Sequence, residues 1–279
     1  MAFEAVLDDH INRKPKGRKR LGDSNSIGAA LDPSDDKVPT WTGTIYMGRF
    51  TPMDVVFDTG SDWLMIESHL CDDCPGNTYD ISGSEQVGPR ISERVYGESI
   101  LRGVEHKDTV CILLSACVYE FEFFAIYSQK EGMAEPIDGI LGLARSNKFY
   151  YAPGVKPGET HGPLYANAMY SQGLIDQRTV SFYYNGKVGT SYVDFGTPQV
   201  SAMSNARDIR WIEMEKDFFW SAYNSGVGIG STDYSNTFAY ASKGERHYPK
   251  TIKDNSVYTI FDTGLSAIML SGGYAEGVI

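Results

Sequence analysis

From Trp41 onward, short apolar runs alternate with polar or glycine-containing breaks. The first runs are WTGTIYMG, MDVVF and WLMIES, and the later ones are RTVSFYY, SYVDFG, IRWIEM, FWSAY and YTIFDTG. They are rich in β-branched and aromatic residues and end at glycine, proline or aspartate, which is typical of strands separated by turns. Many short strands of this kind predict a mostly β architecture.

One stretch favours a helix instead. Pro163 suits the first turn of a helix, the residues PLYANAMYSQ are compatible with helical structure, and Gly173 suits a C-terminal stop. We therefore expect a short helix here, with strands before and after it.

The four cysteines fall into two close pairs, Cys71 with Cys74 and Cys111 with Cys117. The second pair lies within TVCILLSACVYEFEFFAI, which we interpret as two strands folded about residues 115–116. This arrangement predicts two local disulfides, which persist in oxidising compartments. Free buried thiols or a lone CxxC motif are the alternatives. A zinc site is not expected, because CDDC has no second pair at ligand spacing and the histidines are scattered.

Residues 1–39 differ from the rest of the chain. They have little apolar periodicity and change from a basic run, Arg13–Arg20, to an acidic stretch around Asp35. This composition predicts a tail, a linker or the remnant of a pro-segment. The first residues also carry acidic side chains where a secretory leader needs an uninterrupted apolar core.

The composition excludes several classes of protein. The 279 residues are 42% hydrophobic and 22% charged, as in ordinary folded domains, so a fibrous or largely disordered chain is excluded. The formal net charge of -11 argues against a nucleic-acid partner, because phosphate binding needs a clustered excess of lysine and arginine. We expect no membrane span, because no stretch of about eighteen residues is apolar throughout.

One internal repeat carries chemistry. Residues 55–61 (VVFDTGS) and 258–265 (YTIFDTGL) each lead from an apolar strand into an Asp-Thr-Gly turn, at Asp58 and Asp262. A single copy is best interpreted as a strand that enters an ordinary turn. Two copies, each entered by a strand that ends in phenylalanine, are far rarer by chance. The repeat predicts that two carboxylates meet about a pseudo-twofold axis and hold one water between them.

The chemistry of such a pair is that of a combined general acid and base. Two carboxylates this close cannot both ionise easily, so they share one proton and one pKa rises. The ionised group can take a proton from the water as it attacks a peptide carbonyl, and the protonated group supplies one to the developing oxyanion. Gly60 and Gly264 allow tight turns whose N–H groups reach the carboxylates. The hydroxyls of Thr59 and Thr263 can bond across the pair and lock the turns together.

From about Trp41 to its last residue, the sequence resembles the pepsin-like aspartic proteases. The resemblance rests on both Asp-Thr-Gly copies, on Tyr96-Gly97 at the place of the flap, on the hairpin spacing of Gly103 and Asp108-Thr109-Val110, on Ile137–Ala144, on Gln172–Ile175 and on Cys71. It implies a bilobal, mostly β acid protease fold.

The same resemblance implies roles for individual residues. Asp58 and Asp262 would be the catalytic pair, and Ser61 would bond the outer oxygen of Asp58. Tyr96 would lie on the flap, residues 96–98, which covers the substrate. If the spacing of the surrounding motifs is ignored, the alternative is that Tyr96 is an aromatic residue at the end of a strand, packed on the surface.

Three positions depart from the family's pattern. Leu265 stands where a threonine or serine usually supports the second aspartate, and Ser266 is the alternative donor. Met65 stands where a tryptophan usually anchors the flap tyrosine, so we expect Tyr96 to be held differently. Glu98 would add an ionisable group near the cleft and favour basic side chains in the substrate.

The chain that follows Asp262 is short for this family. A second lobe has no room there for its own closing segment, so strands around Asp262 would leave backbone groups unpaired. We therefore expect an incomplete second lobe and a product truncated at its C-terminus. The expected division is residues 1–39 as the terminal segment, 40–186 as the N-lobe with the flap, and 187–279 as a partial C-lobe.

Together these features predict an aspartic endopeptidase that cleaves extended peptide or protein substrates at acid pH. We expect no cofactor or metal, a monomer, and a secreted, lysosomal or vacuolar setting. Leu265 and the short C-terminal part motivate an alternative, a catalytically impaired peptide-binding protein or an inactive fragment. A glycosidase also needs two acidic residues, but it explains neither the repeat nor the flap. The basic run Arg13–Arg20 has two interpretations, an inhibitory segment attracted to the carboxylates or a solvated linker.

Overall fold

Strands make up most of the described chain. The computed structural model describes residues 18–19, 27–33, 41–88, 91–96, 99–130, 137–145, 161–184, 191–198, 212, 219–224, 228–229, 232–233 and 257–265. The strands are β1 (Arg18–Lys19), β2 (Ile27–Pro33), β3 (Trp41–Met47), β4 (Thr51–Asp58), β5 (Leu64–Glu67), β6 (Glu85–Gln86), β7 (Ser92–Tyr96), β8 (Ser99–Leu113), β9 (Ala116–Lys130), β10 (Gly139–Gly142), β11 (Val180–Tyr183), β12 (Ser191–Phe195), β13 (Ser221–Asn224), β14 (Gly228–Ile229), β15 (Thr232–Asp233) and β16 (Val257–Ile260). One α-helix among these residues, α1, covers Tyr165–Ser171, and a 3₁₀ helix covers Ile81–Gly83. The mostly β prediction is confirmed.

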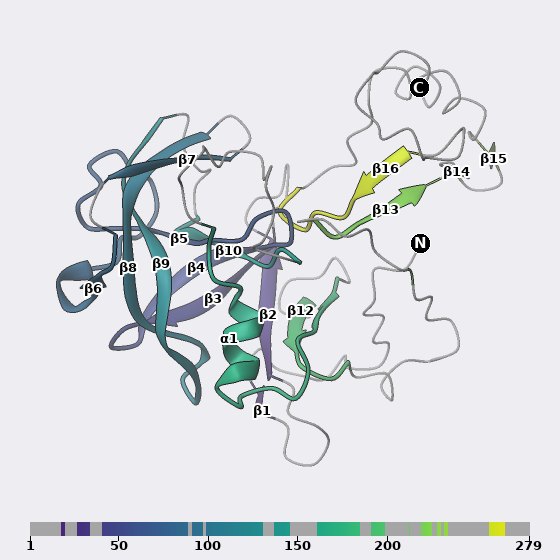
Figure 1. The fold of residues 1–279 in the computed structure, drawn as a ribbon, viewed down its shortest axis with the longest axis horizontal. Helices are drawn as coiled ribbons and strands as arrows, with labels where there is room; N and C mark the ends of the chain where they lie inside the picture. The colour runs from purple at the N-terminus through teal and green to yellow at the C-terminus, as the bar shows by residue number, and fades with distance from the viewer. Residues whose placement is uncertain are drawn as a thin grey trace.

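Within the described ranges, one large sheet contains 12 strands. Along it the order is β11, β12, β2, β3, β4, β10, β5, β9, β8 and β6, while β1 pairs with β2 and β7 pairs with β8. Figure 1 shows this body, with the separate pair β13–β16 to one side of it in green and yellow. Strand β10 lies between β4 and β5, parallel to β4 and antiparallel to β5. This insertion brings the end of β10 beside the end of β4, at Asp58.

Strand β5, which follows the first Asp-Thr-Gly turn, is buried on both faces. Successive side chains of a strand point to opposite faces. Leu64 and Ile66 accordingly join the main hydrophobic core, whereas Met65 lies in a second cluster. We call this second group the hairpin cluster, and it consists of Trp63, Met65, Cys71, Leu101, Phe124 and Ile126. The strand that leaves the first turn is therefore held between two apolar layers.

Part of the N-terminal segment belongs to the large sheet. Strand β2 pairs antiparallel with β12 on one side and with β3 on the other. Ile27, Ala29 and Leu31 are buried and alternate with less buried residues. The sequence predicted a tail, a linker or the remnant of a pro-segment for residues 1–39, and within this segment residues 27–33 form a strand of the large sheet. The reason is that every second residue of this short stretch is apolar, which gives it a side that faces the core.

Helix α1 lies where the sequence predicts a helix. It begins at Tyr165, two residues after Pro163, and it ends before Gly173, whose φ of 72° favours glycine. Tyr165 and Met169, four residues apart on one face, are buried. In the described part of the chain, α1 is too short to cross a membrane.

Both predicted disulfides are present. Cys71 is bonded to Cys74, and Cys111 is bonded to Cys117. The second bond joins β8 to β9, in which Cys111 and Cys117 are paired across the hairpin. The bonds thus fasten two places close to the strands that carry the hairpin cluster.

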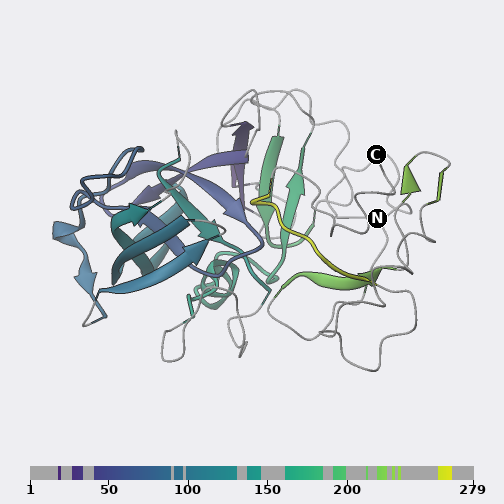
Figure 2. The same cartoon turned by 90° about the horizontal axis from the view of Figure 1, so that it is seen from above.

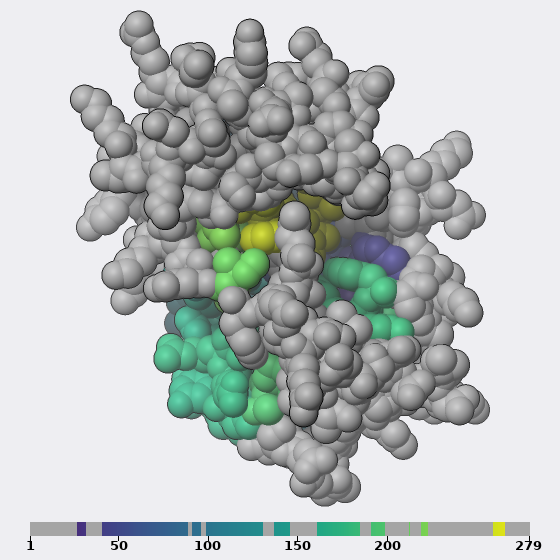
Figure 3. Space-filling view, turned by 90° about the vertical axis from the view of Figure 1, so that its right-hand side faces the viewer, coloured from purple at the N-terminus to yellow at the C-terminus, as the bar shows by residue number. Residues whose placement is uncertain are grey.

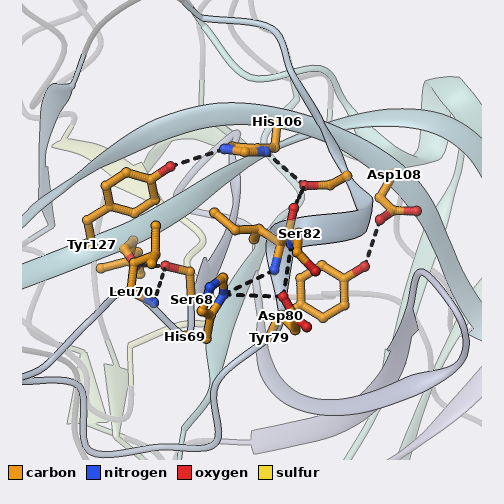
Figure 4. Close-up of polar contacts among 12 residues, drawn as sticks. Ser68, His69, Leu70, Tyr79, Asp80, Ser82, His106, Asp108 and Tyr127 are labelled. Carbon is orange, nitrogen blue, oxygen red and sulfur yellow. Dashed lines mark hydrogen bonds and ion pairs between the residues drawn. The ribbon is translucent and has the colours of Figure 1, made fainter.

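A polar network fixes the segment between β5 and β6 to the long strand β8 (Figure 4). The His106 ring on β8 lies 2.8 Å from Ser84 Oγ and 3.2 Å from Tyr127 Oη. Tyr79 Oη donates to Asp108 Oδ2 at 2.7 Å. Burial lowers the pKa of His106, which favours the neutral form of its ring. The middle of β8 is therefore tied to the chain that leaves β5.

Candidate active site

The first Asp-Thr-Gly turn is clasped by the end of β10. Leu143 N donates to Asp58 O at 2.6 Å, and Gly142 N donates to Trp63 O at 2.9 Å. A Cβ atom on Gly142 would lie 2.4 Å from the carbonyl carbon of Asp62, so only glycine fits against this turn. The segment IDGILGLA, identified by its resemblance, thus packs directly on the loop that carries Asp58.

The second turn follows β16, which pairs antiparallel with β13. Phe261 N donates to Trp220 O at 2.8 Å, and the indole Nε1 of Trp220 donates to Leu143 O at 2.8 Å. Trp220 therefore connects the second turn to the segment that clasps the first. Figure 2 shows the yellow chain after β16 running toward the large sheet, and Figure 3 shows its atoms beside the green atoms of residues 219–224.

Reciprocal hydrogen bonds join the two turns. Thr59 Oγ1 donates to Phe261 O at 2.8 Å and accepts a bond from Thr263 N at 2.9 Å. In the same way, Thr263 Oγ1 donates to Phe57 O at 2.6 Å and accepts a bond from Thr59 N at 3.0 Å. Each hydroxyl thus serves as both donor and acceptor, and the four bonds form a pseudo-twofold pair. They place the residue before each threonine, an aspartate, at the junction.

The two carboxylates have matched backbone partners but different side-chain partners. Gly60 N donates to Asp58 Oδ1 and Gly264 N donates to Asp262 Oδ1, both at 2.8 Å. Ser61 Oγ also donates to Asp58 Oδ2. Leu265, at the equivalent place in the second turn, has no hydroxyl to offer, and Ser266 lies outside the described residues. Asp58 is buried, whereas Asp262 is exposed.

Each glycine of the pair lies against the opposite aspartate. A Cβ atom on Gly60 would be 2.5 Å from Asp262 Oδ2, and one on Gly264 would be 2.6 Å from Asp58 Oδ1. The pKa of Asp58 is raised to about 7, mainly by burial and then by the charge and the hydrogen bond of the nearby Asp262. The bonds from Ser61 and Gly60 act in the opposite direction. The arrangement favours a pair of carboxyl groups that retains one proton near neutral pH.

One further predicted site residue, Tyr96, lies at the end of a strand pair. Strands β7 and β8 pair antiparallel, with Tyr96 opposite Ser99 at the end of the register. The backbone of Tyr96 thus closes the hairpin where the flap is expected. Its side chain, together with Gly97 and Glu98, lies outside the described residues.

A hydrogen-bonded Asp–His pair beside the first turn escaped the sequence analysis. Asp62 accepts hydrogen bonds from His161 Nδ1 at 3.0 Å and from Gly162 N at 2.9 Å. Burial raises the pKa of the Asp62 carboxyl, and its bonds to His161 and Gly162 oppose that effect. The pair ties the chain that precedes α1 to the loop that carries Asp58. An acidic residue directly after Ser61 was the signal, but its partner is too distant in sequence to be inferred.

A mostly β fold in which two matched Asp-Thr-Gly turns face each other defines the class of pepsin-like aspartic proteases. The family profile described as eukaryotic aspartyl protease matches residues 40–278, and the chain therefore belongs to this family.

Individual relatives agree with this assignment. Vacuolar protease A of Arthroderma otae is 27% identical over 237 residues, covering 81% of this chain and 52% of that protein. Cathepsin D of Dictyostelium discoideum is 26% identical over 233 residues, covering 78% of this chain and 57% of that protein. The chain thus spans about half the length of the curated relatives it matches. The crystal structure of aspartic proteinase from Irpex lacteus shares the fold, with a TM-score of 0.65 and 18% identity over 90% of this chain and 67% of that one.

Proposed function

We propose that the chain is an aspartic-type endopeptidase in which Asp58 and Asp262 activate a water for attack on a peptide bond. The reciprocal bonds of Thr59 and Thr263 carry this proposal, because they hold two carboxyl-bearing turns face to face. Four reciprocal bonds between two turns more than 200 residues apart in sequence support a shared role for the two turns. The raised pKa of Asp58 supports it further, since a pair that keeps one proton has both an acid and a base.

The proposed mechanism uses the pair as a unit. One proton is shared, so the ionised oxygen takes a proton from the water while the protonated group donates to the carbonyl oxygen. Gly60 N and Gly264 N each bond one carboxylate oxygen and orient the two groups. The substrate would bind as an extended peptide beneath the β7–β8 hairpin.

A secreted, lysosomal or vacuolar setting is part of the proposal. Two disulfides are typical of proteins in oxidising compartments. The relatives named vacuolar protease A and cathepsin D fit that setting.

Turnover by this chain is expected to fall as pH rises through about 7, the raised pKa of Asp58. The reason is that the shared proton is lost there, and with it the general acid. The measurement is kcat/KM for a mixed peptide library between acid and mildly alkaline pH. A statin-type inhibitor is the control and should suppress cleavage at acid pH.

The same assay separates the runner-up from the proposal. Among the described residues, Asp262 accepts no hydroxyl bond like the one from Ser61 to Asp58, because Leu265 stands at the equivalent place. This favours a catalytically impaired, peptide-binding protein as the second candidate. Measurable affinity for peptides without turnover at any pH would support that candidate. Rapid cleavage that the inhibitor blocks would dismiss it.

Replacement of Leu265 by threonine is expected to raise kcat/KM by about tenfold, the worth of one hydrogen bond to a charged group. The new hydroxyl can donate to the outer oxygen of Asp262 as Ser61 does for Asp58, which stabilises the ionised form. The acid limb of the pH profile should therefore shift to lower pH.

Leu265→Val is the matched control, because valine has the shape of threonine without its hydroxyl. Equal kinetics of the threonine and valine variants would show that the hydroxyl at this position has no effect on Asp262.

A further inference from the structure

Arg94 is a buried arginine in the hairpin that the proposed function places over the substrate. It lies on β7, paired with Leu101 of β8, and its side chain is only 2% exposed. The side chain has a rigid, fully charged head group, which is costly to bury unless its charge and its N–H groups find partners. The partners of Arg94 therefore show what the residue holds together.

Two aromatic rings flank the guanidinium. Its Cζ atom is 5.5 Å from the centroid of the Trp63 ring and 5.0 Å from that of Phe124, both within range of a cation–π contact. The two rings also contact each other, with centroids 6.4 Å apart. Trp63 belongs to the loop that leaves Asp58, and Phe124 belongs to β9. One side chain from the hairpin thus reaches two other segments of the hairpin cluster.

The charge of Arg94 is balanced within the hairpin. Its Nη2 atom lies 3.2 Å from Glu105 Oε1 on β8. Its Nη1 atom donates to Ser92 Oγ at 3.0 Å and to Glu93 O at 3.1 Å. The counter-charge and two further hydrogen-bond acceptors of Arg94 thus all belong to the hairpin itself.

We infer that Arg94 is a positioning residue that fastens the β7–β8 hairpin to the chain leaving the first Asp-Thr-Gly turn. This inference rests on the proposed function for its effect on substrate, because it makes the hairpin the cover of the site. An apolar residue could fill the same space but would make no directional bonds. The planar guanidinium of arginine makes directional hydrogen bonds within the hairpin, and its contacts with the rings fix the distance and tilt of the hairpin relative to the loop that leaves Asp58. Through the ring of Trp63, Arg94 contacts the loop that leaves Asp58.

The test combines hydrogen exchange with kinetics for the full chain. In Arg94→Met, amide exchange of residues 92–103 should accelerate by at least about tenfold, while exchange in β4 and β10 stays unchanged. If the wild-type chain cleaves peptide, KM should rise by about tenfold and kcat should change far less, because substrate cover is lost rather than chemistry. The exchange rate and KM of Arg94→Lys should lie between those of wild type and Arg94→Met, since lysine keeps the charge but lacks the planar guanidinium.

Arg102→Met is the matched control on the same hairpin. Arg102 forms an ion pair with Glu93 at 3.1 Å, but its side chain is 63% exposed, so its removal should leave exchange and KM within about twofold of wild type. Equal exchange of the hairpin in Arg94→Met and Arg102→Met would overturn the inference.

Two further outcomes remain decisive. If Arg94→Met fails to fold, Glu105→Gln, which leaves the guanidinium without its counter-charge, must accelerate exchange in the hairpin, and unchanged exchange would refute the role. If wild type shows no turnover, faster exchange in the Arg94 variants still supports the positioning role, while the proposed function fails by itself.

Discussion

Replacing Asp58 with asparagine is expected to lower kcat for peptide cleavage by about four orders of magnitude. Asparagine has nearly the same shape and can keep the bond from Gly60 N. It can neither take a proton from water nor share one with Asp262, so the acid–base pair is lost. The measurement is the single-turnover rate at acid pH with the peptide that wild type cleaves best. Substantial activity in this variant would refute the roles assigned to both carboxyl groups.

In the same variant, the free energy of unfolding should depend on pH less than it does in wild type. The pKa of Asp58 is raised in the folded chain to about 7, so the group binds a proton that the unfolded chain has released. Stability from this group is therefore complete below the unfolded pKa of about 3.9 and is lost as pH rises through about 7. The asparagine of the variant cannot titrate, so its free energy of unfolding should fall less between acid and mildly alkaline pH. Urea unfolding at both pH values checks this and shows that the variant is folded.

Replacing Gly60 with alanine is expected to lower kcat by about a hundredfold or more. The new Cβ atom would lie 2.5 Å from Asp262 Oδ2, closer than such atoms can approach, so the Asp262 carboxyl must shift away. A displacement of this kind separates the carboxyl groups and breaks the shared-proton geometry, although both aspartates remain. Kinetics at acid pH and affinity for a statin-type inhibitor are the measurements, and both should fall together.

Gly83→Ala is the control for this substitution. A Cβ atom on Gly83 meets no atom within 4 Å, so the change tests the replacement of glycine without a clash. Its kinetics should match those of wild type. A Gly60→Ala chain that is as active as Gly83→Ala would mean that the turns do not meet as described.

The local features of this chain could be predicted because each depends on residues close in sequence. Cys111 and Cys117 flank a tight turn, so pairing across the hairpin follows from their spacing. The helix between Pro163 and Gly173 was predicted for the same reason, since proline and glycine act on the nearest turns of the backbone. Strand β2 was missed, although its alternating apolar residues were visible, because the surrounding charged residues hid a short signal.

Contacts between distant segments could not be predicted. Three contacts each join parts of the chain far apart in sequence: the hydrogen bond between Asp62 and His161, the bond from Trp220 to Leu143, and the contacts of Arg94. An aspartate, a tryptophan or an arginine in a sequence does not reveal its partner, because burial and pairing depend on how strands pack.

The repeated Asp-Thr-Gly turns show the same division most clearly. The amino-acid sequence alone determined that two strands each end in a carboxylate followed by a hydroxyl and a glycine, and this pattern predicted a pair of acids. The sequence also predicted that the hydroxyls of Thr59 and Thr263 bond across the pair, as they do. Only the tertiary structure decided which carboxyl is buried: Asp58 is buried and has a raised pKa, while Asp262 is exposed. The physical reason is that backbone conformation depends on neighbouring residues, whereas desolvation and charge interactions depend on everything that packs around a group.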